Sequence, residues 1–386
     1  MSKKAIFATL CALGFACQPS TAGAQVVATV EQARPGDPST VALLVTYANK
    51  GSEPVALRLI DVPRTGKDEK LRSNALNVVG IDGSLPRYLG YHMGMTREAL
   101  SRTQTLAPGE FMTRTINLNA NYELKAGMSY DVSPTEYRQS PVQHSEECAA
   151  SRDLQHCTRG IFTTPPTIRI TVPDSTTPHV PPKGAAEANT EIACTPDQLN
   201  AITAAMGPSS DLARDAKSYL ASLYKTEVID GNVVTRFNQT PRYSSWFGSH
   251  GDPDAPNPVN KRIRDVVNAA ADRYGMLSPA TCNCSDEDEK DGTTAWVDPN
   301  SAHIINYCPA FFKLPVGPNI QTGSRAVTIY HEVTHFDDFL SKGVSDLEGK
   351  FGSPDDARWV ARNERDLAAD NAYNFEYFAD NYSSEE

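Results

Sequence analysis

Residues 329–335 read Ile329-Tyr330-His331-Glu332-Val333-Thr334-His335, and this stretch decides how the second half of the chain folds. Ile329 and Val333 are followed by Phe336 and Leu340 at helical spacings, which predicts one helix over 324–340 with one buried face. Gly343 is a candidate stop for this helix. His331 and His335 are four residues apart, so both imidazoles project from neighbouring turns and can bind one ion.

The residue between these histidines suits a hydrolase. Glu332 lies about 100° around the helix from His331, so its carboxylate can reach a metal-bound water without joining the ligands. Zinc with three protein ligands keeps a fourth position for water and lowers the pKa of that water to about 7. Glu332 would take the proton of the water and pass it to the leaving amine. The motif predicts a metalloendopeptidase with one Zn²⁺ per chain.

The third zinc ligand has several candidates downstream: Asp337, Asp338, Asp346, Glu348 and Glu364. Asp337 and Asp338 follow His335 by only two and three residues on the predicted helix, so both point away from the ion. Asp346 comes after Gly343, where the chain can turn back. We favour Asp346 and keep Glu364 as the alternative, because residues 363–366 resemble the segment in which a glutamate from a second helix completes a zinc site.

The start of the chain predicts export. Lys3 and Lys4 precede an apolar run over 5–17, and small residues end at Ala24, so residues 1–24 are predicted to be a signal peptide. No later stretch approaches the roughly 20 apolar residues of a spanning helix. We therefore expect a soluble, secreted protein, reaching the extracellular space directly or through a periplasm. The formal net charge of −11, without a basic cluster, argues against nucleic acid or an anionic membrane as partner.

The cysteines fit an exported protein. Removal of the signal peptide takes away Cys11 and Cys17, and the remaining six are Cys148, Cys157, Cys194, Cys282, Cys284 and Cys308. An even number in an oxidising compartment favours three disulfides.

The two halves of the chain differ in pattern. Residues 25–172 alternate apolar and polar residues in short runs between turn formers such as Asp82-Gly83, which predicts an all-β, immunoglobulin-like sandwich. Residues 173–190 form a Pro-rich linker that is open to proteases. Residues 191–386 predict an α+β, mostly helical catalytic domain of the zincin type. Its expected elements are a helix from Thr195 that Gly207 closes, helices over 212–224 and 259–274, a hairpin over 294–297 and 304–307, and a helical last 60 residues.

With these residues in view, the second half resembles the deuterolysin family of metalloendopeptidases, the aspzincins, whose third zinc ligand is an aspartate. Their marker G-T-x-D-x-x-Y-G corresponds to residues 343–352, in which Gly343 and Asp346 match. Val344 replaces the threonine, two residues are inserted, and Gly349 or Phe351 stands in place of the tyrosine. The resemblance implies that this tyrosine donates a hydrogen bond to the oxyanion, so Tyr330, Tyr373 or Tyr377 would have to substitute for it.

The resemblance extends over nearly the whole mature chain. Residues 371–381 look like the closing helix of the family, which is expected to pack in the core through Phe375 and Phe378. The family's cysteine arrangement implies the pairs Cys194–Cys282 and Cys284–Cys308, which leaves Cys148 with Cys157. Residues 82–83, 88–90 and 106–110 resemble the family's N-terminal propeptide. The resemblance thus implies a zymogen whose β-sandwich shields the cleft until the linker is cut.

Two functions remain open on the sequence alone. The first is a secreted zinc metalloendopeptidase that acts on proteins or peptides, with its own propeptide domain as intramolecular inhibitor. The second is a zinc-binding but catalytically weak or inactive adhesin-like or toxin-like module, because the expected tyrosine is replaced. A tyrosine hydroxyl within reach of the site would favour the first.

Overall fold

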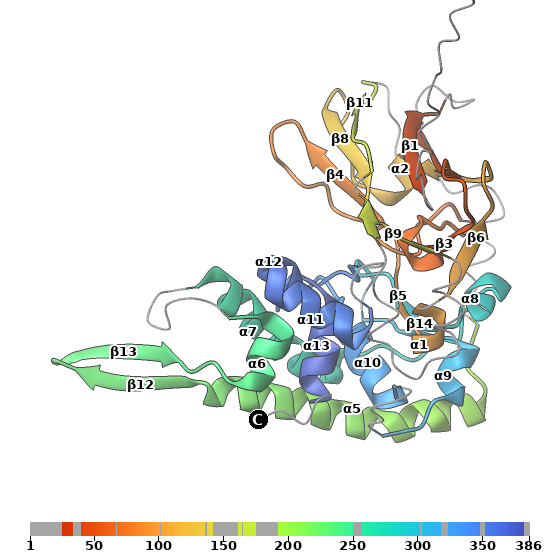
Figure 1. Ribbon diagram of the computed structural model, residues 1–386. Helices are drawn as coiled ribbons and strands as arrows, with labels where there is room; N and C mark the ends of the chain where they lie inside the picture. Colours follow the sequence, from red (N-terminus) through yellow and green to blue (C-terminus); the bar gives the residue numbers. More distant parts are fainter. Residues whose placement is uncertain are drawn as a thin grey trace, which may run out of the picture.

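Figure 1 shows the computed structural model of the chain, in which a β-rich N-terminal region lies above a mostly helical C-terminal region. The described residues are 25–33, 40–66, 68–100, 102–135, 137–141, 161–163, 165–174, 192–249, 257–301, 303–317, 323–347 and 352–381. The predicted signal peptide, the Cys148–Cys157 pair and most of the predicted linker lie outside these residues.

The N-terminal region is built from antiparallel strands, in agreement with the alternating sequence pattern. Residues of β2 alternate between buried and half-buried, as a strand with one face on a core requires. The three sheets are β1 (Val26–Gln32), β2 (Ala42–Asn49) and β7 (Phe111–Asn117); β10 (Ile161–Thr163), β9 (Tyr137–Pro141), β3 (Val55–Arg58) and β6 (Thr103–Leu106); and β11 (Ile168–Thr171), β8 (Ser129–Pro134) and β4 (Leu76–Gly80). The short helical turns here are η1 (Leu59–Asp61), α1 (Arg97–Leu100) and α2 (Leu118–Asn121).

The C-terminal region is α+β and mostly helical, as predicted. Its helices are α5 (Pro196–Ser222), α6 (Pro241–Phe247), α7 (Pro258–Arg273), η3 (Tyr274–Met276), α8 (Asp286–Asp291), α9 (Pro309–Lys313), α10 (Arg325–Thr334), α11 (Pro354–Asn363), α12 (Arg365–Ala368) and α13 (Ala372–Ala379). Its strands are β12 (Tyr224–Ile229), β13 (Asn232–Phe237), β14 (Thr293–Val297) and β15 (Asn306–Tyr307). Phe375 and Phe378 of α13 are buried in the main core, as expected of the closing helix. None of the helices in the described ranges is both long and apolar enough to cross a membrane.

Two helix boundaries differ from the sequence-based prediction. Gly207 does not end the first helix, because α5 continues through Pro208 to Ser222. Ala205, Ser209, Ala213 and Ala216 form one buried stripe across the predicted break, so tertiary packing outweighs the local preference of glycine and proline.

The sequence pattern also missed the exposed hairpin β12–β13, although its turn at Asp230-Gly231 is a typical hairpin signal.

The second helix boundary that differs from the prediction is the end of α10, the helix that carries the histidines. It ends at Thr334, well before Leu340, which is only half-buried. The Asp338 carboxylate accepts hydrogen bonds from the backbone N–H groups of Leu340 and Ser341, which holds the chain in a turn. The buried Arg273 guanidinium in turn binds both oxygens of Asp338 and the carbonyls of Val333 and Ser341.

This arrangement makes Asp338 a strong contributor to stability. Asp338→Ala would leave the Arg273 guanidinium buried without its carboxylate, which typically costs about 3–5 kcal/mol in the free energy of unfolding. Urea unfolding of the uncut chain measures this, with the exposed Asp337→Ala as matched control. Equal unfolding midpoints for the two variants would contradict the prediction.

The pH dependence of stability should follow from the same pair. Burial opposes ionisation of Asp338, but hydrogen bonds from Arg273 and His303 outweigh burial and hold the pKa of this carboxyl well below its usual range. A pKa lowered on folding contributes stability above the unfolded pKa of about 4, which is lost as the pH falls below it.

One strand of the N-terminal region belongs to the C-terminal sheet. β5 (His92–Met95) pairs antiparallel with β14, which pairs on its other side with β15. The predicted hairpin over 294–307 therefore exists as β14 and β15, but it carries a third strand from far away in the sequence. Ile60 and Leu100 also pack into the C-terminal core.

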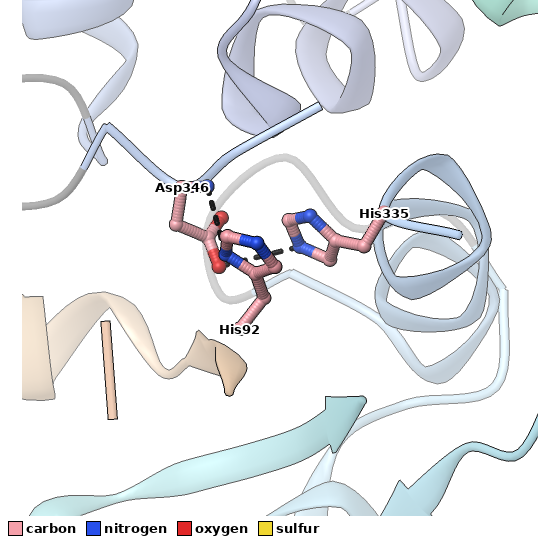
Figure 2. A group of neighbouring side chains, drawn as sticks. All are labelled: His92, His335 and Asp346. Carbon is pink, nitrogen blue, oxygen red and sulfur yellow. Dashed lines mark hydrogen bonds and ion pairs between the residues drawn. The ribbon is translucent and has the colours of Figure 1, made fainter. Parts of the chain in front are cut away.

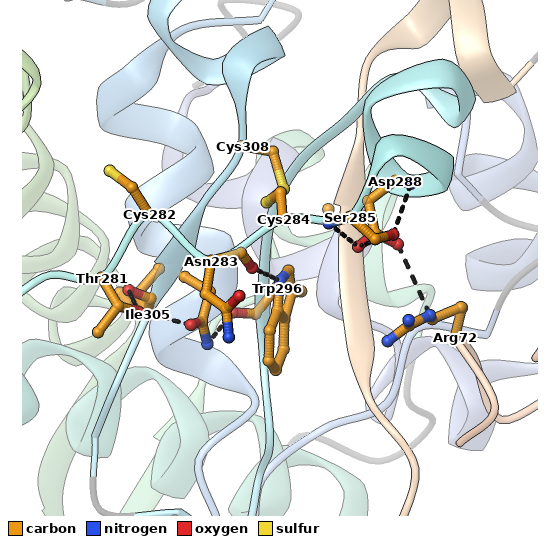
Figure 3. The surroundings of a disulfide bond; sticks show 12 residues. Arg72, Thr281, Cys282, Asn283, Cys284, Ser285, Asp288, Trp296, Ile305 and Cys308 are labelled. Atoms are coloured by element: carbon orange, nitrogen blue, oxygen red, sulfur yellow. Dashed lines mark hydrogen bonds and ion pairs between the residues drawn. A yellow bond between two sulfur atoms is a disulfide. The ribbon is translucent and has the colours of Figure 1, made fainter. Parts of the chain in front are cut away.

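Disulfides brace the region beside this sheet. The structure contains Cys194–Cys282 and Cys284–Cys308, the same pairs that the family resemblance implies. Figure 3 shows the second bond next to Trp296, whose indole N–H donates to the carbonyl of Asn283. The two bonds thus tie the segment 281–285 to the start of α5 and to the end of β15.

Candidate metal centre and active site

The helix α10 holds the candidate site in the interior of the protein. The Ser324 hydroxyl caps its start by accepting a hydrogen bond from the N–H of Val327. His331, Glu332 and His335 are all buried, because the helix is covered by β5 and β14 as well as by α13. The predicted buried face is confirmed for Ile329, Val333 and Phe336, but burial extends beyond it to nearly every side chain of α10.

The His331 ring is fixed from two sides. Its Nδ1 lies 2.9 Å from Oε2 of Glu376 on α13, and its ring centroid lies 4.6 Å from that of Tyr373. A carboxylate only accepts, so Nδ1 donates to it, and in the neutral ring Nε2 keeps its lone pair. This Nε2 lies 3.0 Å from Oδ1 of Asp346.

The His335 ring has the same tautomer for a different reason. Its Nδ1 lies 2.7 Å from the carbonyl oxygen of Val344, which can only accept. In the neutral ring Nε2 therefore carries the lone pair, and it lies 3.2 Å from Oδ2 of Asp346. The lone pairs of both histidines thus face the same carboxylate.

Asp346 reaches this position because the chain turns back sharply after α10. A Cβ on Gly343 would lie 1.9 Å from the carbonyl oxygen of His335, so only glycine allows the returning segment to pass this close to the helix end. Ser345 then forms an isolated parallel β-bridge with Asn371, just before α13. Figure 2 shows the fully buried Asp346 carboxylate facing His335. Gly343 therefore serves as a point of close approach, and it is not the helix stop that the sequence suggested.

These side chains change one another's ionisation. Burial raises the pKa of Glu332 to about 7. Burial also disfavours the charged form of Asp346, but His335 and His331 outweigh it and hold the pKa of this carboxyl well below its usual range. Burial lowers the pKa of His331, yet Asp346 and Glu376 together raise it well above its ordinary value.

The three converging groups fit a zinc ion. His331 Nε2, His335 Nε2 and Asp346 Oδ1 are buried and make no hydrogen bond within the described part of the chain. Buried polar atoms normally have a partner, so this arrangement needs a positive charge among the three. Two imidazole nitrogens and one carboxylate oxygen are a donor set that zinc prefers. Glu332 Oε2 is also buried without a hydrogen bond, beside this cluster.

A third histidine lies at the site, and sequence reasoning missed it. His92 of β5 stacks on His335 with ring centroids 4.6 Å apart and an angle of 10° between the planes. Ligand atoms of His92, His335 and Asp346 all lie within 4.8 Å of one another, as Figure 2 illustrates. His92 has no partner at a recognisable spacing in the sequence, so only the fold reveals it. Glu376 was also missed, because its segment was interpreted as a core-packing helix.

The other candidates lie elsewhere. Glu364 sits between α11 and α12 and is not part of the metal-binding cluster found among the described residues. Asp338 binds Arg273, as described above, and Glu348, Gly349 and Phe351 lie outside the described residues. Of the three tyrosines, Tyr377 donates to the carbonyl of Gly352, and Tyr330 is buried in the main core. Tyr373 alone has a ring packed on His331.

A small pocket opens next to His331. It is lined by residues of β5, α10 and α13, including Gly94, Met95, Thr328, Tyr373 and Glu376. Glu376 is its one acidic residue among those described, and its side chain remains 12% exposed. The pocket therefore places the carboxylate of Glu376 beside the candidate zinc ligands.

Comparison with known proteins identifies the family. A family model described as lysine-specific metallo-endopeptidase, of the aspzincins, matches residues 234–380. The chain is 26% identical over 355 residues to an extracellular protease of Aeromonas hydrophila, covering 91% of this chain and 90% of that protein. It is 30% identical over 200 residues to a peptidyl-Lys metalloendopeptidase of Pleurotus ostreatus, covering 50% of this chain and 96% of that protein. A solved zinc peptidase from Grifola frondosa aligns at 25% identity over 50% of this chain and 100% of its own, with a TM-score of 0.39.

The family model's range, residues 234–380, contains α10 and Asp346, and the match to the Pleurotus enzyme covers 96% of that protein. The chain therefore belongs to the aspzincin family and is a zinc metalloendopeptidase, which hydrolyses peptide bonds.

Proposed function

We propose that His331, His335 and Asp346 hold one zinc ion and that Glu332 is the general base and acid of peptide hydrolysis. The observation that carries this proposal is the convergence of three buried donor atoms without hydrogen bonds beside a buried carboxylate. Zinc bound there would polarise the peptide carbonyl and lower the pKa of water. Glu332 would hold the proton and pass it to the leaving amine, while Glu376 and the Val344 carbonyl keep both imidazoles in the required tautomer.

We also propose that the chain is secreted as a zymogen. Residues 1–24 are the signal peptide, 25–172 an immunoglobulin-like propeptide domain, 173–190 the linker that is cut, and 191–386 the peptidase domain. Supporting this, β5 of the N-terminal region lies against the candidate active site. The name of the Aeromonas relative and the two disulfides fit an extracellular location.

The direct test compares the purified chain before and after cleavage in the linker. We expect the cleaved chain to degrade casein, this activity to disappear with a zinc chelator and to return with Zn²⁺, and the uncut chain to be nearly inactive. Equal activity of the two forms would overturn the zymogen proposal. Chelator-resistant activity of the cleaved chain would overturn the proposed zinc site.

We further propose that this pocket favours a lysine side chain of the substrate. Relatives from Pleurotus ostreatus and Grifola frondosa are named peptidyl-Lys metalloendopeptidases, and Glu376 supplies a carboxylate in a pocket beside the proposed zinc site. A hydrogen bond to a charged group contributes about 1.5–3 kcal/mol, so loss of the carboxylate should reduce discrimination by about 10- to 100-fold.

Glu376→Gln tests this preference. With zinc saturating, we expect the ratio of kcat/KM for a lysine peptide to that for a matched methionine peptide to fall by this factor. Glu364→Gln, at the junction of α11 and α12, is the control and should leave the ratio unchanged. An unchanged ratio in Glu376→Gln would exclude this carboxylate as the source of any lysine preference.

A further inference from the structure

The strand β5 occupies the edge of β14 next to the candidate active site. Its register pairs His92 with Val297, Met93 with Trp296 and Gly94 with Ala295. Addition of an extended strand to a free sheet edge is a common mode of peptide binding. A substrate that used this edge of β14 would need the place that β5 fills.

The backbone of β5 contacts the proposed catalytic groups directly. The N–H of Gly94 donates to Oε1 of Glu332 at 3.0 Å, and the N–H of Met93 donates to Oδ2 of Asp346 at 3.2 Å. A Cβ on residue 94 would lie 2.5 Å from Glu332 Oε1, so the approach depends on glycine. The group of β5 that faces Glu332 is therefore a backbone N–H. It occupies the Oε1 atom of Glu332, and it is not a carbonyl group that could be attacked.

The side chain of His92 faces the proposed ligands. It is buried, it stacks on His335, and its Nδ1 accepts a long 3.4 Å contact from the backbone N–H of Asp346. An imidazole nitrogen that accepts is unprotonated, so Nδ1 carries a lone pair on the side of Asp346. This single weak contact leaves the lone pair available to a metal.

Contacts of residues that precede β5 anchor it to the C-terminal region. Arg64 lies 2.5 Å from Asp291, and Arg72 lies 3.6 Å from Asp288, which Figure 3 also shows. Tyr91 packs on Trp296 with ring centroids 4.5 Å apart. These contacts fix where residue 92 lies with respect to α10.

We propose that His92 is the fourth zinc ligand of the uncut chain and leaves with the propeptide when the linker is cut. The inference rests on the proposed zinc site. A zinc site with four protein ligands is closed, whereas catalysis requires an open position. His92 thus makes the latent form a structural zinc site, and cleavage at 173–190 converts that site to a catalytic one by removing a single imidazole.

The test counts imidazole ligands by zinc X-ray absorption in the full-length chain that carries Glu332→Gln to prevent self-cleavage. We expect three imidazoles in this chain and two when His92→Phe is added. Phenylalanine retains the ring that stacks on His335 but has no lone pair, and His92→Ala is the second variant if the larger ring disturbs folding. The control is His303→Ala, because His303 pairs with Asp338 outside the cluster, and it should still show three.

Zinc release to a chromogenic chelator gives an independent readout. Even indirect partners of a metal ligand change metal affinity by about 10- to 100-fold, so His92→Phe should speed release by about tenfold or more. Bound zinc with two imidazoles in both the parent chain and His92→Phe would overturn the role of His92 and leave the proposed zinc site intact. A parent chain that binds no zinc would overturn both.

Discussion

Glu332→Gln is expected to lower kcat/KM for peptide hydrolysis by about 10²- to 10⁴-fold in the cleaved chain, while the zinc content stays the same. The substitution keeps the shape of a side chain that is completely buried, so it should not disturb packing. It removes only the ability to accept and return a proton. Glu332 is not among the atoms that converge on the proposed ion, so zinc binding does not depend on it.

The measurement pairs a casein assay with metal analysis of the same protein. Asp337→Asn is the matched control, because it neutralises an exposed carboxylate two residues after His335. Activity of Glu332→Gln within a factor of two of the parent would exclude Glu332 as the base. Loss of zinc together with activity would instead place Glu332 among the groups that hold the metal.

The sequence was sufficient to predict what depends on local spacing. The four-residue step from His331 to His335 fixes their relative position on any helix, and Gly343 before Asp346 indicated a returning chain. The alternating residues of β2 likewise predicted a strand with one buried face. These features need only a few neighbouring residues to form.

Long-range contacts account for what the sequence could not provide. The helix α10 stops at Thr334 because Arg273, which is 65 residues away from Asp338, stabilises the turn that follows. His92 lies 254 residues from Asp346, and no spacing rule links the two. Glu376 meets His331 only because α13 packs beside α10. Each of these partners is set by tertiary packing, which single-sequence patterns do not encode.

Asp346→Ala is expected to weaken zinc binding by at least about 100-fold and to abolish chelator-sensitive proteolysis of the cleaved chain. Among the described residues, Asp346 is the carboxylate that both imidazole Nε2 atoms face, at 3.0 and 3.2 Å, so its loss leaves the two imidazoles without the anionic ligand. Two imidazoles alone bind zinc far less well than a three-ligand site. Asp346→Asn keeps the volume and separates loss of the charge from loss of packing.

Glu364→Ala distinguishes the two candidates for the third ligand in the same experiment. If Asp346 is the ligand, equilibrium dialysis against Zn²⁺ should show weak binding in Asp346→Ala and normal binding in Glu364→Ala. The reverse result would require Glu364 to leave the junction of α11 and α12 and to reach the histidines. Asp346 needs no such movement, because the bridge from Ser345 to Asn371 and the close approach at Gly343 already hold its carboxylate against both rings. A rigidly held ligand also loses less conformational entropy on binding, so the same geometry that favours Asp346 as the ligand should make the zinc site tight.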